Sequence, residues 1–252
     1  MRLKLNAAKT ELIWFDRKLP CDIDFPSKTL NSEASSLNIT PSKVVRNLGV
    51  LIDCQLTMVN HVSAITRACY FHLRRIRQVR RCLNEHCLRI LVQALVLSQI
   101  DYCNSILSGL PNSTLQPLTS VLHAAARLIK DLQPHNHISP ALQQLHWLPI
   151  HSRIHFKICL LIYNIYSGSS PQYMSSMVTP CSSILSRKSL RSASKGDFVC
   201  TRSCLQFGNR AFSINGEWSI AWNILPESIR RSTTASQFKT KLKTCLFSLN
   251  YD

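Results

Sequence analysis

The sequence predicts a mainly α-helical protein with a short β portion near its N-terminus. From residue 60 onward, apolar residues recur every three or four positions in successive stretches, which is the period of helices with one buried face. Strand-like sequence is confined to residues 10–15 and 43–56. Two or three strands cannot form a domain unaided, so we expect a short β-hairpin or edge sheet, followed by an antiparallel helical bundle and a helical C-terminal extension.

The two strand-like regions differ in pattern. Residues 10–15, TELIWF, are rich in residues that favour strands, whereas in the second region Val50 and Ile52 alternate with Leu51 and Asp53 after Gly49. The proline, serine and asparagine residues between the two regions favour turns. We therefore expect an irregular connection there.

The first predicted helix, residues 60–83, carries an unusual set of basic residues. Six arginines lie between Arg67 and Arg81. At 100° per residue, Arg67, Arg74 and Arg81 lie within about 40° of one another, opposite the apolar stripe. Together with two neighbouring side chains they form what we call the arginine face: Arg67, Tyr70, Arg74, Arg77 and Arg81.

Two interpretations of the arginine face remain open. It could be a solvated helix face, as most charge runs are, or its counter-charge could be the phosphates of a nucleic acid, because no Asp or Glu is interleaved with it. In the second case Tyr70 and Phe71 could stack on bases, although Phe71 could equally belong to the core.

Residues 84–111 predict one long helix that starts at the N-cap Asn84 and ends at Gly109 and Pro111. Because apolar residues surround almost its whole circumference, we expect it to be the central buried helix. Its uncharged run of 11 residues is shorter than the about 20 that a membrane span requires.

Further helices are predicted at residues 112–132, 139–145 and 150–167, and a last one begins at a Thr234–Gln237 capping box.

Charge and cysteine usage indicate the kind of partner and compartment. Lys and Arg number 30 against 13 Asp and Glu, which gives a net charge of +17 and favours a polyanionic partner such as nucleic acid or an anionic membrane surface. The odd count of 11 cysteines, together with the absence of a secretory leader pattern, predicts reduced thiols. We expect an intracellular protein, in the nucleus or cytoplasm, that is not secreted.

No pattern predicts a catalytic residue, a metal ligand or a cofactor. Cys200 and Cys204 have a ligand-like spacing but lack a second pair, and Asp22 with Asp24 favours a turn. A Gly-x-Ser-x-Gly elbow is absent, and with six glycines the chain has no glycine-rich phosphate loop.

Several short motifs occur in an order that resembles a known family. Leu5-Asn6 with Lys9-Thr10-Glu11 is similar to LN-x-x-KTE, and Leu48-Gly49-Val50 running to Asp53 is similar to LGV-x-LD. Residues 97–105, 124–128, 146–149 and 222–226 match further segments. In this order they resemble the C-terminal part of the reverse transcriptase, an RNA-directed DNA polymerase, of LINE-type non-LTR retrotransposons.

The resemblance implies a division of the chain and a role for the arginine face. It implies a palm remnant at 1–56 with the primer-grip-like residues Leu48, Gly49 and Val50, a thumb-like helical bundle at 57–132, and a C-terminal extension over the rest of the chain. Composition and helical pattern divide this last part into a helical extension at 133–179, a basic Ser-rich linker at 180–209 and a C-terminal helical segment at 210–252. The arginine face would then lie along the RNA and DNA of a template–primer duplex, with no role for a membrane.

The resemblance also implies what these residues do not carry. Family polymerases hold two magnesium ions on aspartates upstream of LN-x-x-KTE, so magnesium is implied for the full-length enzyme and not for this chain. We expect a fragment without polymerase activity, and the upstream polymerase portion is an implied partner. Two alternatives are a small basic α-helical protein–protein interaction module and a non-functional decayed reading frame.

Overall fold

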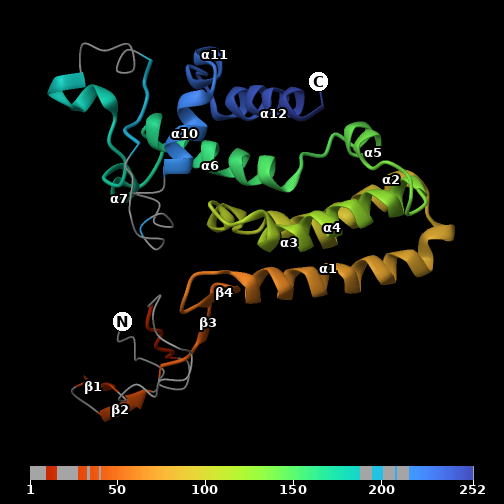
Figure 1. Ribbon diagram of the computed structural model, residues 1–252, viewed down its shortest axis with the longest axis horizontal. Helices are drawn as coiled ribbons and strands as arrows, with labels where there is room; N and C mark the ends of the chain where they lie inside the picture. The colour runs from red at the N-terminus through yellow and green to blue at the C-terminus, as the bar shows by residue number, and fades with distance from the viewer. Residues whose placement is uncertain are drawn as a thin grey trace. The chain divides into compact units, whose positions relative to one another are not determined.

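A computed structural model describes residues 10–15, 28–32, 35–39, 41–187, 195–200, 208 and 216–251 (Figure 1). These residues are mainly helical, with short antiparallel strands preceding the helices, which confirms the predicted fold class. The chain divides into two compact units, Met1–Ser63 and Ala64–Asp252. The finer division of the second unit at residues 133, 180 and 210 stays a prediction.

The described strands of the first unit form two antiparallel pairs. Strand β1 (Lys28–Ser32) pairs with β2 (Ser35–Ile39), and β3 (Val44–Asn47) pairs with β4 (Val50–Asp53). The β1–β2 hairpin lies where we expected an irregular connection, so that expectation was wrong. Its sequences, KTLNS and SSLNI, lack the apolar alternation by which a half-buried strand is recognised.

The strand-like residues 10–15 contribute an isolated bridge rather than a strand. Leu12 bridges Pro41 in parallel, and its carbonyl accepts a 2.7 Å hydrogen bond from Ser42 N. The prediction from β-forming composition was therefore too strong at this segment. Composition records how well a side chain fits a pleated surface, whereas a strand also needs a neighbour along its length.

The β3–β4 hairpin is closed by a two-residue turn. Leu48 (φ 47°) and Gly49 (φ 87°) both have positive φ, as a type I′ turn requires. Beyond β4, the loop to α1 is held by the buried carboxylate of Asp53. Asp53 accepts hydrogen bonds from Thr57 N at 2.9 Å, from Met58 N at 2.7 Å, and from Gln55 N at 3.2 Å.

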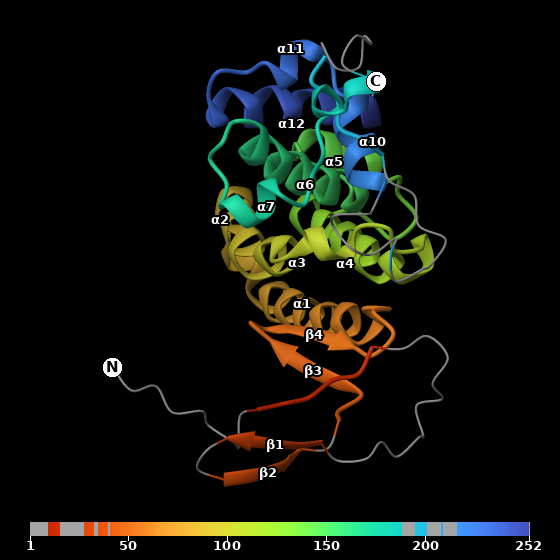
Figure 2. The same ribbon diagram turned by 90° about the vertical axis from the view of Figure 1, so that its left-hand side faces the viewer.

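The helices of the second unit lie in successive layers that follow the order of the chain (Figures 1 and 2). Helix α1 begins in the first unit and is followed by the layer of α2 to α4, then by α5 and α6, and last by α10 to α12. Their bounds are α1 Val59–Val79, α2 Glu85–Val92, α3 Ser98–Asp101, α4 Asn112–Lys130, α5 Ser139–Gln144, α6 Ile150–Tyr166, α7 Gln172–Ser175, α10 Gly216–Ile224, α11 Glu227–Arg230 and α12 Ala235–Tyr251.

The segment 84–111 is not one long helix. Asn84 caps α2 as predicted, its side chain accepting a 2.8 Å bond from Cys87 N. However, a π-helical turn, Gln93–Leu97, interrupts the segment, α3 ends at Asp101, and Cys103 adopts a left-handed conformation. A π turn adds a residue and rotates the buried face, which a 3.6-residue pattern cannot reveal.

The segment 84–111 shares the core with α4. Ile90 is 53% exposed, so the expectation that this segment is buried around almost its whole circumference was wrong. Its Val92 and Val96 are nevertheless fully buried, as are Leu118 and Val121 of α4. None of the described helices combines the length and the apolar character needed to cross a membrane.

An aromatic cluster joins α6 to the C-terminal helices. The rings of Tyr163 and Phe238 stack with centroids 4.2 Å apart, and Trp222 packs 6.0 Å from Phe238. The N-cap half of the predicted capping box is confirmed by the 3.2 Å bond from Gln237 N to Thr234 Oγ1 at the start of α12, whereas Gln237 Oε1 accepts from Thr233 Oγ1 at 3.0 Å.

Candidate nucleic-acid interface

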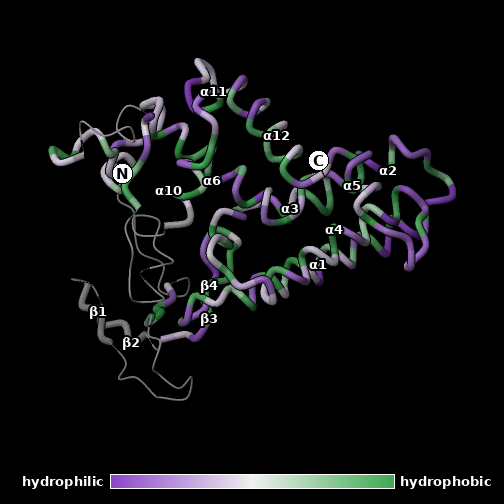
Figure 3. The backbone as a smooth tube through the Cα atoms, turned by 45° about the horizontal axis from the view of Figure 1, so that its top comes forward, coloured by the Kyte–Doolittle hydropathy of each residue, from purple (hydrophilic) through white to green (hydrophobic). Residues whose placement is uncertain are grey.

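Helix α1 has one buried face and one basic face. Cys69, Leu73 and Ile76 are buried, and the tube in Figure 3 alternates between hydrophobic and hydrophilic along the helix. The Sγ of Cys69 lies 3.8 Å from the carbonyl oxygen of Val96, and burial raises the pKa of this thiol to about 11. The apolar face thus fixes the rotation of α1 against the π turn.

The arginine face is exposed to solvent. Arg67, Arg74, Arg77 and Arg81 are all exposed, and within the described part of the chain none of them forms an ion pair. The 21 residues of α1 include no Asp or Glu that could neutralise them. The structure therefore places an uncompensated line of positive charge on one face.

The end of α1 differs from the prediction. The α-helix ends at Val79, and Arg80–Cys82 form a 3₁₀ turn, so the predicted helix 60–83 is too long. The 100° spacing therefore does not extend to Arg81, although its side chain remains exposed.

Two aromatic side chains lie beside the arginines. Tyr70 is 42% exposed and Phe71 is 55% exposed, which excludes the alternative that Phe71 belongs to the core. The guanidinium carbon of Arg75 lies 5.7 Å from the centre of the Phe71 ring. Arg75 thus presents its charge next to the arginine face through a cation–π contact.

A cleft of about 480 Å³ adjoins Arg77 where the ends of α1 and α4 meet. One wall is fixed by Arg80, which pairs with Asp131 at 3.1 Å and donates from Nε to the carbonyl of Leu128 at 2.8 Å. Arg127 also lines the cleft, and its buried Nε has no hydrogen-bond partner among the described residues. The cleft therefore extends the arginine face to a second helix.

Sequence reasoning missed Arg127. It is a charged residue at the end of a helix whose inward positions are otherwise apolar, and this position could have identified it as a candidate binding residue. Its role was hidden because the cleft forms from two helices whose contact is not encoded in the spacing of either one.

The primer-grip-like residues belong to the first unit. Leu48 is 84% exposed at the tip of the β3–β4 turn, Gly49 supplies the second positive φ, and Val50 is buried. These three residues thus form a turn with an apolar side chain presented to solvent. The described residues contain no group of three His, Cys, Asp or Glu that could hold a metal ion, and Cys204 lies outside them.

Comparison with known proteins identifies no relative. No family model, no curated protein and no solved structure matches this chain.

Proposed function

We propose that this chain is part of a LINE-type non-LTR retrotransposon reverse transcriptase and that its arginine face binds the backbone of an RNA–DNA template–primer duplex. The ordered motifs support the first half of the proposal. The observation that carries the second half is the exposure of Arg67, Arg74, Arg77 and Arg81 without acidic partners.

The geometry of α1 suits a phosphate backbone. Arg67 and Arg77 are about 15 Å apart along the helix axis at 1.5 Å per residue, a distance over which a duplex presents several phosphates. Arginine binds phosphate through a planar fork of donors, and the three arginines of the arginine face that α1 itself carries, Arg67, Arg74 and Arg77, can contact successive phosphates. Such contacts position the duplex without reading its sequence.

The proposal assigns binding rather than polymerisation to these residues. The Tyr/Phe-Ala-Asp-Asp motif that holds the metal ions in family enzymes does not occur in the 252 residues. The upstream polymerase portion is a further proposed partner. The proposed compartment is intracellular, nucleus or cytoplasm, where the free thiols of the described cysteines stay reduced.

A salt series tests the binding. The affinity of the purified chain for an RNA–DNA hybrid is expected to fall log-linearly with salt concentration. Changing Arg67, Arg74 and Arg81 to Ala is expected to lower that slope by about two to three, at roughly 0.7 to 0.9 per phosphate contact. The matched control changes Lys195, Lys239 and Lys241 to Ala, which removes the same charge outside α1 and is expected to leave the slope nearly unchanged.

Two results would contradict the proposal. An equal loss of slope in both triple variants would show that the net charge, and not the arginine face, binds the duplex. Magnesium-dependent primer extension by the purified chain would contradict the assignment of binding without polymerisation.

One observation favours a protein-interaction module as the second candidate function. A groove of about 430 Å³ is lined by apolar side chains of α4, α6, α10 and α12. Ile220, Ile224 and Leu249 at this groove are at least half exposed. Binding of an apolar segment there would be almost independent of salt, which separates it from phosphate binding.

A further inference from the structure

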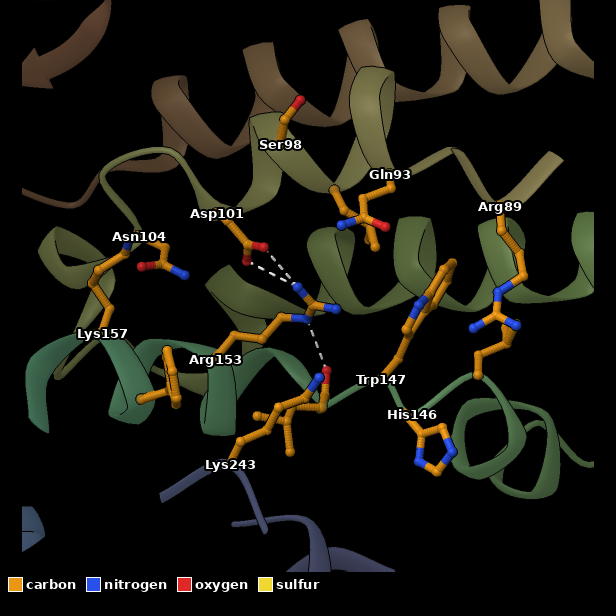
Figure 4. A pocket seen from close by; sticks show the side chains of 14 residues that line it. Arg89, Gln93, Ser98, Asp101, Asn104, His146, Trp147, Arg153, Lys157 and Lys243 are labelled. Carbon is orange, nitrogen blue, oxygen red and sulfur yellow. Dashed lines mark hydrogen bonds and ion pairs between the residues drawn. The ribbon is translucent and has the colours of Figure 1, made fainter. Parts of the chain in front are cut away.

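A second basic site lies on the side of the α2–α4 layer that faces away from α1. Its cleft, of about 600 Å³, is lined by α2 and α3, by the connection between α5 and α6, and by α6 and α12 (Figure 4). Four cations line it against the single carboxylate of Asp101, so its formal charge is +3. These cations are Arg89, Arg153, Lys157 and Lys243.

One of the four cations has a structural partner. Arg153 Nη1 donates to both carboxylate oxygens of Asp101, at 2.7 and 3.0 Å, and Arg153 Nε donates to the carbonyl of Leu148 at 2.9 Å (Figure 4). Arg153 thereby ties α6 to the end of α3. It provides a rigid centre to the cleft and leaves little charge for a ligand.

The remaining three cations form no ion pair. Arg89 from α2, Lys157 from α6 and Lys243 from α12 have none in the part of the chain that the structure describes, although Glu85 lies within electrostatic range of Arg89. They come from three different helices around one cavity, with Lys157 on one side of Arg153 and Arg89 on the other (Figure 4). This arrangement differs from a run of charge along one helix, and it suits an elongated anion with several oxygens.

The cleft also holds an unsatisfied acceptor. Asn104 is 3% exposed and lines the cleft, and its Oδ1 is buried without a hydrogen-bond partner among the described residues. In Figure 4 Asn104 and Lys157 lie on one side of Arg153, and Trp147 and Arg89 lie on the other. A buried acceptor of this kind gains from a ligand that brings an O–H or N–H donor.

An aromatic wall completes the site. Trp147 lines the cleft, and its backbone carbonyl accepts a 2.7 Å hydrogen bond from the hydroxyl of Tyr251 in α12. This bond restrains the backbone at Trp147, and the residue is only 8% exposed, so packing holds the indole before any ligand arrives. A fixed ring, next to the stackable guanidinium of Arg89, favours a planar group in the ligand.

We propose that this cleft binds a nucleoside phosphate. Lys157 and Lys243 contact the phosphates, Asn104 Oδ1 accepts from a sugar hydroxyl, and the base packs against Trp147 beside Arg89. The volume lies in the range of small-molecule sites. The site shares no residue with the arginine face, so it goes beyond the function proposed above and does not depend on it.

Calorimetric titration of the purified chain with ATP tests the proposal. We expect saturable binding, weakened by about tenfold or more for each of Lys157→Met and Lys243→Met because each change removes a charged contact. Asn104→Leu removes the orphaned acceptor without adding charge. It is expected to raise the melting temperature of the free chain and to weaken ATP binding, a pair of effects that a purely structural role of Asn104 would not produce.

Further titrations separate the sources of the same chemistry. Inorganic triphosphate supplies phosphates without a ring or a sugar and is expected to bind more weakly than ATP. A short 5′-phosphorylated single-stranded oligonucleotide presents the nucleotide as a strand end. If it displaces ATP, the strand end is a source of ligand, and if it does not, free nucleotides are the source.

Three results would overturn the proposal. They are an absence of ATP binding at millimolar concentration, equal binding of inorganic triphosphate and ATP, and unchanged ATP affinity in both lysine variants. The Arg67, Arg74 and Arg81 triple variant is expected to bind ATP normally, and Lys157→Met is expected to keep the salt slope for the hybrid. Failure of one proposal is therefore distinguishable from failure of the other.

Discussion

Asp53 is expected to hold the loop that leads into the arginine-bearing helix, and Asp53→Ala tests this. Two of the three backbone donors, Gln55 N and Thr57 N, are partly accessible and can return to water, whereas Met58 N is buried. The variant therefore loses the equivalent of about one buried, charge-assisted hydrogen bond, or roughly 2–3 kcal/mol. The loop also contains two non-glycine residues at positive φ, Leu56 and Met58, each of which costs about 1 kcal/mol or more and needs the clamp to persist.

Hydrogen exchange measured by mass spectrometry on the peptide covering residues 54–62 detects the loss. A change of about 3 kcal/mol in the local opening free energy corresponds to about 100-fold faster exchange. The matched control is Glu11→Ala, because Glu11 Oε2 accepts a 3.2 Å bond from Arg46 N at an exposed site. If the two variants exchange alike in this peptide, the carboxylate of Asp53 does not hold the loop and the reasoning fails.

Two further predictions concern titratable groups. Burial lowers the pKa of His61, whose Nδ1 accepts a 3.4 Å hydrogen bond from Leu51 N. As the pH falls, the imidazole of His61 therefore becomes protonated in the unfolded chain before it does in the folded chain. Protection of β4 and of the start of α1 from hydrogen exchange is expected to be full above about pH 6.5 and to be lost as the pH falls below it. His61→Gln should flatten this pH dependence of exchange. Burial, followed by the influence of Cys245, raises the pKa of Cys159 to about 12. At pH 8 only about one Cys159 thiol in 10,000 is then ionised, so iodoacetamide should modify the exposed Cys82 far faster than Cys159. Comparable rates of modification in the native chain would contradict the packing of α6.

Where the sequence carried a local signal, the prediction matched the structure closely. Helix α6 was expected at 150–167 and spans Ile150–Tyr166, because its apolar period is regular and Gly168 takes the left-handed conformation that ends it. The start of α12 was predicted from a side chain that does cap it. Periodicity and capping are properties of a few adjacent residues, so they depend little on tertiary contacts with the rest of the chain.

The errors arise where tertiary contacts decide the backbone. The π turn at Gln93–Leu97 coincides with the contact between Cys69 and Val96, and the sequence of the segment alone gives no reason to interrupt the helix there. For the candidate interface, exposure of the arginine face followed from helical spacing. Arg127 and the cations of the second cleft could not be predicted, because each cleft combines residues that are far apart in the chain.

The chain has only 13 acidic residues, and their positions decide which of the basic side chains are held in ion pairs and which can bind a ligand. Of the five described ion pairs, four join different segments, including Arg80–Asp131 and the nearly buried Arg230–Asp197. Among the described residues, the arginines of the arginine face form no such pair, and neither do Arg89, Lys157 and Lys243 of the second cleft. Because buried pairs are screened by salt much less than exposed charges, salt that releases a bound polyanion should leave Arg230–Asp197 intact, whereas Arg80–Asp131, whose aspartate side chain is 77% exposed, should weaken. A salt series on this chain thus reports on binding and not on unfolding, provided that the circular dichroism spectrum stays constant across it.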